Sequence, residues 1–336
     1  MNRKDILLER INEAIPELIR LQDTTGCFFY PYYKGNVDYC NARWQEAVLA
    51  LAWISKKNKN KELDQRIEKG INFLITIQNK NGSFPEYSKK DTSFSATAFV
   101  SFSLIMTFKI MKIEIKKEWI EMLDKSLRWL SKEDETVYTN QESAAGTSLI
   151  LGGLFFQNQI YIDSGLKKIH RVLDSKKAYY SENGGFDLGY SSLTLEYLGF
   201  VYNAGYLKEK IKNSVEEYYE YLLDINLEDI KNSRNTKWII LEGFEIFADK
   251  TKSGEKILNK ILKLDISLDH LEREDNLCTD LYRLCFAYEH MSSLLDNKIN
   301  LGNFNPEKYN GGSHKKIFNP LRRFGLHRIR SKIRLF

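Results

Sequence analysis

Proline and cysteine are scarce in this 336-residue chain, and long apolar runs are missing. Five prolines interrupt a sequence in which Lys, Glu, Leu and Ile, residues that favour helices, are abundant. No segment approaches the roughly eighteen uninterrupted apolar residues of a spanning helix, and the N-terminus, MNRKDILLER, carries charges within its first turns. We therefore expect a helical protein without a membrane-spanning segment or a secretory signal.

The few cysteines form no CxxC pair, which is typical of unpaired thiols in a reducing cytosol. They are Cys27, Cys40, Cys278 and Cys285. A zinc site could combine Cys278 or Cys285 with His290, but the spacing matches none of the strong metal patterns. We predict four free thiols, no metal site and no cofactor.

Positive charge is concentrated at the C-terminal end of the chain. The net charge is +5, yet residues 315–336 alone hold eight basic residues and no acid, so the rest of the chain is net acidic. These residues are Lys315, Lys316, Arg322, Arg323, Arg328, Arg330, Lys332 and Arg334. The body of the protein therefore offers no electrostatic reason to expect nucleic acid as a partner.

Two kinds of predicted helix alternate about six times along the chain. One kind has a single apolar stripe and a charged face, and these helices are expected at 4–22, 61–79, 115–132, 161–175, 206–224 and 253–264. The other kind is apolar nearly all round, as in SFSATAFVSFSLIMTF, and these are expected at 41–57, 92–111, 141–157, 188–204, 235–249 and 275–294. Helices that are apolar on every side must be buried, which predicts an inner ring and an outer ring.

A period of about 40–50 residues also fits an open solenoid of helical pairs. The glycine and aromatic residues that punctuate the turns favour a closed ring. We therefore predict an all-α fold, an (α/α)6 toroid over residues 1–300, followed by a polar linker at 301–314 and a basic tail at 315–336.

Residues 69–84, KGINFLITIQNKNGSF, resemble the repeat motif of squalene cyclases and protein prenyltransferase β-subunits. The matching positions are Lys69, Gly70, Phe73, Gln78, Gly82 and Phe84. A weaker copy contains Gln22, Gly26 and Phe28, and NGGFDLGY at 183–190 is a remnant. The resemblance implies that the Gln caps helix ends, the Gly permits a tight turn and the aromatic ring fills the space between layers.

The catalytic motifs of that terpenoid cyclase and prenyltransferase superfamily are absent from this sequence. It contains neither DxDD nor DDxxD, and the Asp, Cys and His zinc ligands of the prenyltransferases have no counterpart. Toroids of similar architecture occur in polysaccharide lyases, glucuronyl hydrolases and sugar epimerases, which is an analogy of fold alone.

Candidate functional residues lie in the turns that precede the inner helices, because in a barrel of hairpins these turns meet at one mouth. Paired carboxylates with Tyr, Asn and Arg suit acid–base work on a sugar. The predicted catalytic residues are Asp187, Tyr190, Glu142 and Asp91. The predicted substrate-binding residues are Arg43, Tyr87, Asn183, Arg234, Trp238, Asp280 and Arg283.

Several of these residues could instead have a purely structural role. Asp91 and Asp187 stand where helices favour N-capping acids. Arg43 and Arg283 fall at the starts of apolar helices, where an unpaired charge is costly, so each needs a salt-bridge partner or a ligand. The histidines form no Ser/His/Asp or Cys/His arrangement.

Two further segments bear on the partner. The aromatic run CFFYPYY (27–33) offers rings on which sugars or isoprenoid chains can stack. In the tail, an apolar strip with a cationic border is the recipe for lying on an anionic membrane surface. The alternatives for the tail are docking on the toroid or a partner, and a flexible solubilising segment.

Together these patterns predict a cytoplasmic toroid, peripheral on the inner membrane face, that acts on or binds an anionic glycan or a lipid-linked sugar intermediate. Lyase-, epimerase- or hydrolase-like acid–base chemistry in surface polysaccharide biosynthesis would fit this setting. The alternatives are an isoprenoid-binding cyclase-like or prenyltransferase-like protein, and a scaffold without catalysis.

Overall fold

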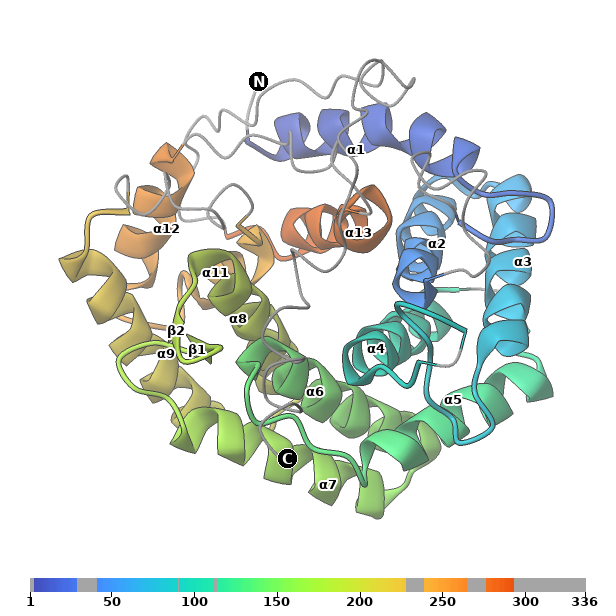
Figure 1. The fold of residues 1–336 in the computed structure, drawn as a ribbon. Helices are drawn as coiled ribbons and strands as arrows, with labels where there is room; N and C mark the ends of the chain where they lie inside the picture. The colour runs from blue at the N-terminus through green and yellow to red at the C-terminus, as the bar shows by residue number, and fades with distance from the viewer. Residues whose placement is uncertain are drawn as a thin grey trace.

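The computed structural model of this chain describes residues 3–28, 41–89, 91–111, 114–227, 239–264 and 276–292. Within these ranges, helices alternate between an outer and an inner ring, as Figure 1 shows. The outer helices are α1 (Arg3–Arg20), α3 (Lys61–Ile77), α5 (Lys117–Leu130), α7 (Gln159–Asp174), α9 (Lys208–Asp224) and α12 (Gly254–Lys263). The inner helices are α2 (Ala47–Asn58), α4 (Phe94–Ile110), α6 (Thr139–Phe156), α8 (Leu188–Asn203), α11 (Leu241–Phe247) and α13 (Asn276–Glu289). The predicted all-α toroid is confirmed.

The predicted helix bounds agree with the structure to within a few residues, with two differences. A 3-10 helix, η2 (Ala42–Glu46), leads into α2, so the first inner element begins with a tighter turn than expected. The inner helix of the fifth pair is shorter than expected, because α11 begins only at Leu241, and residues 235–238 of the expected helix lie outside the described residues.

Burial explains which helices form the inner ring. In α4 nearly every side chain is buried, including serines and threonines, two of which donate to backbone oxygens: Thr97 Oγ1 to Ser93 O and Ser103 Oγ to Glu46 O. In α5 the buried residues form one stripe that contains Trp119, Leu123 and Leu127, while charged residues cover the opposite face. A helix with one apolar stripe needs one neighbouring layer, whereas a helix that is apolar on all sides needs neighbours all around it.

The ring is closed, because the last helices pack against the first. Helix α13 packs against α1, α2 and α11, as Figure 1 also shows. The Arg3 guanidinium pairs with the Glu245 carboxylate at 2.5 Å, and both side chains are buried. Trp53 Nε1 donates to Glu289 Oε1 at 3.0 Å, which joins α2 to the end of α13. An open solenoid would keep these residues apart.

The glutamines of the repeat motif connect successive outer helices. Gln78 Nε2 donates to the backbone oxygen of Met122 in α5 at 2.8 Å. Gln22 Nε2 donates to the backbone oxygen of Arg66 in α3 at 2.9 Å. These glutamines were expected to cap helix ends. The structure refines that expectation, since each bonds a carbonyl within the next outer helix.

The glycines of the motif bring each turn against the next outer helix. Gly26 and Gly82 have φ angles of +96° and +95°, a region that favours glycine, and a Cβ atom at either position would lie 2.3 Å from a backbone oxygen of that helix. The motif aromatics, Phe28 and Phe84, are fully buried. The predicted roles of the glycine and of the aromatic ring are confirmed.

Candidate functional site

Neighbouring turns that precede the inner helices are in contact, as the toroid predicts. Ala42 N donates to Pro85 O at 3.1 Å, which joins the approach to α2 with the approach to α4. Tyr138 and Glu182 form an isolated β-bridge, which joins the approaches to α6 and α8. Residues far apart in sequence therefore meet at the N-terminal ends of the inner helices.

The predicted anion-binding Arg43 lies at the start of η2, with its guanidinium group over the ring of Phe99 at 4.1 Å. Arg43 Nε donates to Glu46 Oε1 at 2.7 Å. The Arg43 side chain is 18% exposed, whereas that of Glu46 is 0% exposed. Burial raises the pKa of Glu46, while Arg43 and Arg283 oppose that rise.

Arg283 is buried between three inner helices and donates to groups on each side. Its Nε donates to Glu196 Oε2 at 2.9 Å, and its side-chain NH groups reach Asp280 Oδ1 at 3.1 Å and the hydroxyl of Tyr197 at 3.0 Å. The distance from Arg283 to the Glu46 carboxylate is 3.8 Å. Glu46 therefore stands between the two arginines.

Beyond Arg283, the contacts continue through two carboxyl groups and an imidazole. Glu196 and Glu242 interact through their side chains, and burial raises the pKa of each well above its ordinary value, against the effect of Arg283. His290 Nδ1 lies 2.6 Å from Glu242 Oε1. The His290 side chain is 31% exposed, whereas that of Glu242 is 0% exposed.

We call these groups together the central cluster. Its members are Arg43, Glu46, Glu196, Glu242, Asp280, Arg283 and His290. They come from η2, α8, α11 and α13 and from the residue after α13. Charges this deeply buried are costly unless they are paired, and breaking one pair typically costs about 3–5 kcal/mol. Strongly perturbed carboxyl groups around two arginines, one of them buried, make this cluster the candidate site.

The predicted acid Asp187 serves as the N-cap of α8. Its Oδ1 accepts a hydrogen bond from Tyr190 N at 3.0 Å. Asn183 has φ +52° and lies in the turn between the short strands β1 (Ser181–Glu182) and β2 (Gly185–Phe186). The structure thus places these three predicted residues together at the start of α8, in a different group from the central cluster.

Glu182, beside them, was not among the predicted residues. Its two carboxyl oxygens accept hydrogen bonds from the backbone and side-chain nitrogens of Asn140 at 2.8 and 2.7 Å. Burial raises the pKa of Glu182 to about 8. This carboxyl group fastens the hairpin to the first turn of α6.

The predicted acid Glu142 is buried and faces the outer helix α7. Its carboxylate lies 2.6 Å from Arg171 and 3.5 Å from Lys168, and it accepts a hydrogen bond from Glu135 N at 3.1 Å. Asp134 binds the same two cations. These contacts give Glu142 a role in fastening α6 to α7.

Asp91 and Tyr87 lie in the loop before α4. Asp91 Oδ2 accepts hydrogen bonds from the backbone nitrogens of Glu86 and Tyr87, each at 3.2 Å, and so orders that loop. Tyr87 is 43% exposed. Both residues belong to this loop, and Arg234 and Trp238 lie outside the described residues.

Three of the predicted substrate-binding residues, Arg43, Asp280 and Arg283, therefore come together around Glu46. The three glutamates of the cluster were missed, although each stands within the apolar sequence of an inner helix: ARWQEAVLALAWI, YSSLTLEYLGFVY and WIILEGFEIF. A carboxylate in such a run must have a buried partner, and that signal could have identified Glu46, Glu196 and Glu242.

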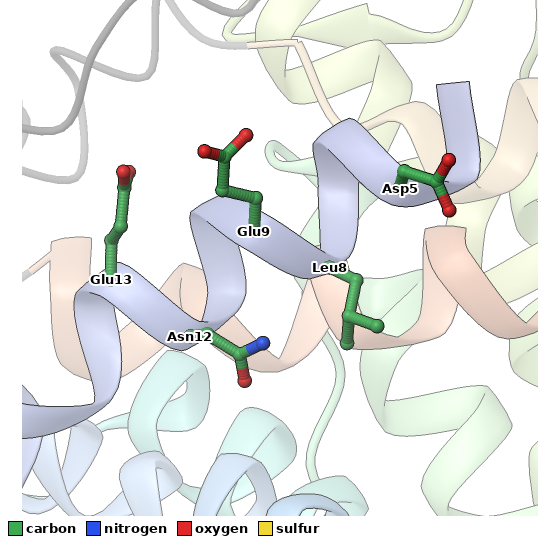
Figure 2. Close-up of a pocket in the computed structure, with 5 residues that line it drawn as sticks. All are labelled: Asp5, Leu8, Glu9, Asn12 and Glu13. Atoms are coloured by element: carbon green, nitrogen blue, oxygen red, sulfur yellow. The ribbon is translucent and has the colours of Figure 1, made fainter. Parts of the chain in front are cut away.

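A shallow surface pocket lies on the outer helix α1, lined by Asp5, Leu8, Glu9, Asn12 and Glu13 (Figure 2). All five residues come from that one helix, so the pocket does not gather groups from several elements. It carries no indication of a site.

The described residues contain no group of three or more His, Cys, Asp or Glu side chains placed to hold a metal ion. Among the described helices, none is both long enough and apolar enough to cross a bilayer. Cys27, Cys278 and Cys285 are free and buried.

The chain matches no family model. A solved structure described as D-mannose isomerase superposes on it with a TM-score of 0.53 at 12% sequence identity, covering 91% of this chain and 96% of that one. At this identity the similarity shows the fold alone, a helical toroid. The resemblance to cyclases and prenyltransferases in particular remains a prediction.

The chain is also 23% identical over 249 residues to reticulocyte-binding protein homolog 1 of Plasmodium falciparum (isolate 3D7). That match covers 71% of this chain but spans only 8% of the length of that protein. It carries no argument about function.

Proposed function

We propose that this protein is a carbohydrate-active toroid that binds an anionic sugar or glycan at the mouth side of the central cluster. Arg43 would bind the anionic group, and Glu46 and Asp280 would provide acid–base chemistry. The observation that carries this proposal is the convergence of two guanidinium groups and four carboxyl groups from four elements in the barrel interior.

The residue types match the chemistry of sugars. A guanidinium group binds a uronate or phosphate through paired hydrogen bonds. A carboxyl group with a raised pKa, such as Glu46, keeps its proton to a higher pH than an ordinary carboxyl group and can deliver it, while a second carboxylate accepts one. Arg43 and Asp280 are the more exposed members on this side, with side chains 18% and 8% exposed, so a ligand would meet them first.

The structural neighbour supports the same class of substrate. Its name, D-mannose isomerase, says that it acts on a sugar, and it shares the toroidal fold over nearly the whole of both chains. That support is an analogy of architecture, and the choice of an anionic sugar comes from the arginines of this chain.

A binding screen tests the proposal. Uronate-containing oligosaccharides, D-mannose and prenyl diphosphates are compared by calorimetry with wild type, Arg43→Gln and Arg128→Gln. Arg128 is a matched control, since it pairs with Asp124 on the outer helix α5. Loss of a charged hydrogen bond should weaken uronate binding by about tenfold or more in Arg43→Gln alone. Equal weakening by both variants contradicts the site.

Acid–base action is tested by incubating a bound sugar in D2O and following deuterium incorporation by NMR. We expect exchange at a carbon next to the carbonyl or carboxylate, slowed at least tenfold in Asp280→Asn and in Glu46→Gln. Binding without exchange would leave a sugar-binding protein and remove the catalytic part of the proposal.

Aromatic rings in the barrel interior are what the alternative, isoprenoid binding, would use. Phe102 packs against Tyr197 and Phe200, with ring centroids 5.1 and 4.9 Å apart. Because charged groups stand among these rings, they support an apolar ligand less well than a sugar. Binding of prenyl diphosphates without sugars in the screen would reverse the ranking, and no binding at all would favour a scaffold.

We further propose that a lipid-linked form of the substrate is met at an anionic membrane surface through residues 315–336. These residues lie outside the described part of the chain, and the proposal rests on their apolar and basic sequence pattern. Liposome sedimentation with and without these residues tests it: truncation should abolish pelleting with anionic vesicles, and unchanged pelleting would eliminate the membrane role.

A further inference from the structure

Buried side chains of the central cluster form a chain of contacts that runs away from the mouth. Arg283 donates to Glu196, Glu196 interacts with Glu242, and Glu242 meets His290. Asp280 lies near the start of α13 and His290 directly after its end, so the chain of contacts extends along the length of that helix.

Close backbone packing brings the two glutamates together. A Cβ atom on Gly243 would lie 2.7 Å from the backbone nitrogen of Glu196, which means that α11 lies directly against α8 at this level. Glu242 immediately precedes that glycine. The side chains of both glutamates are 0% exposed, so neither carboxyl group has access to bulk water.

One oxygen on each glutamate lacks a conventional donor. Glu196 Oε2 accepts from Arg283, and Glu242 Oε1 lies against His290, while Glu196 Oε1 and Glu242 Oε2 are buried with no donor. Two buried carboxylates in contact cannot both remain ionised, whereas a proton between them provides the missing donor. We propose that Glu196 and Glu242 hold one proton between them and that His290 exchanges this proton with solvent at the end of the barrel away from the mouth.

Protons cannot pass from the two glutamates toward the mouth, because a group that does not deprotonate stands in the way. Arg283 stands between Glu196 and Asp280, and a guanidinium group does not deprotonate in proteins. His290 is 31% exposed and touches Glu242 through Nδ1. A proton taken up at Nε2 therefore releases the Nδ1 proton to the Glu242 carboxylate, so that the doubly ionised pair becomes singly charged and the imidazole stays neutral.

Other charged groups lie around these three residues. Arg283 acts on both glutamates, and Glu289 acts on His290. The charged groups on the surrounding elements are Glu46 of η2, 3.8 Å from Arg283, Lys57 of α2, 3.3 Å from Glu289, and the Arg3–Glu245 pair of α1 and α11. Protonation of one glutamate reduces the excess of carboxylates over guanidinium groups in the central cluster. The shared proton belongs to the free protein, whether or not a sugar binds.

The sign of one pKa change tests the shared proton. In Glu196→Gln the amide donates to Glu242, which then carries a full charge beside His290, so the pKa of His290 should rise by about 1. Were both glutamates ionised, removing one negative charge would lower that pKa. Glu289→Gln, a matched control outside the pair, should lower it slightly.

NMR titration of the imidazole nitrogens measures these values directly. If the pKa of His290 falls or stays the same in Glu196→Gln, the shared proton is overturned. It is also overturned if every infrared band of a protonated carboxyl group seen in wild type persists in both Glu196→Gln and Glu242→Gln. In His290→Gln the same band should exchange into D2O at least tenfold more slowly than in wild type. Equal exchange rates would refute the role of His290.

Discussion

Replacing Gly82 by alanine should destabilise the toroid more than replacing Gly205, although both glycines have the same backbone conformation. Their φ angles are +95° and +93°, so an L-residue costs about 1–2 kcal/mol at either position. Only Gly82 is crowded: its Cβ would lie 2.3 Å from Lys125 O, whereas a Cβ on Gly205 would meet nothing within 4 Å.

The turn at Gly82 cannot easily move away from α5. Gly82 O accepts hydrogen bonds from Ser126 Oγ at 2.9 Å and from Gln78 Nε2 at 3.2 Å. Relieving the clash must stretch these bonds or shift the helix, and such overpacking typically costs about 1–3 kcal/mol. We therefore expect a loss of about 1–2 kcal/mol for Gly205→Ala and about 2–5 kcal/mol for Gly82→Ala.

Urea unfolding followed by far-UV circular dichroism measures both losses. Alanine restricts the unfolded chain equally at the two positions, so that contribution cancels in the comparison. Equal losses for the two variants would refute the idea that glycine is needed in the repeat because each turn packs closely against the next outer helix.

Three further substitutions test individual contacts. Arg3→Met should lower the free energy of unfolding in urea by about 3–5 kcal/mol, because it leaves Glu245 buried without its cation. Adding Glu245→Met should restore much of that loss. A double variant no more stable than the single one contradicts this account. Burial raises the pKa of Glu182 from 4.5 to about 8, so the folded state holds that proton more tightly and stability falls as pH rises between these values. Glu182→Gln should remove this fall. The free energy of unfolding of this variant in urea, relative to that of wild type, should therefore rise from about pH 5 to about pH 8. A difference between the two proteins that does not change with pH is the contrary result. Asp187→Ala should cost about 1 kcal/mol by removing the cap on Tyr190 N, whereas Asp187→Asn should be nearly neutral; similar thermal unfolding temperatures for Asn and Ala would argue against capping.

The alternation of helix types was sufficient to predict the two rings, because the burial of a helix depends on how many of its faces are apolar. The repeat motif around Gln78 and Gly82 then predicted ring closure and the tight turns. The partner of the glutamine was missed, since its hydrogen bond reaches a residue 44 positions away, Met122, that no local pattern marks.

The candidate site was predicted in part. Arg43 and Arg283 were selected because a charge at the start of an apolar helix needs a partner, and the structure provides one for each. Asp187 and Asp91 were selected for their position before a helix, where capping and turn-forming acids also occur. Position in a turn could not separate these roles, whereas an acid inside an apolar helix, such as Glu196, would have pointed inward more directly.

The ion pair between Arg3 and Glu245 joins residues 242 positions apart, and it fixes an order of events for the growing polypeptide. During synthesis the first helix is made long before the carboxylate that neutralises its arginine, so α1 must wait with an unmatched cation and an uncovered apolar stripe until the last hairpins leave the ribosome. A shortened chain that stops before α11 would leave that helix without its counterpart, so α1 would stay accessible to chaperones and proteases.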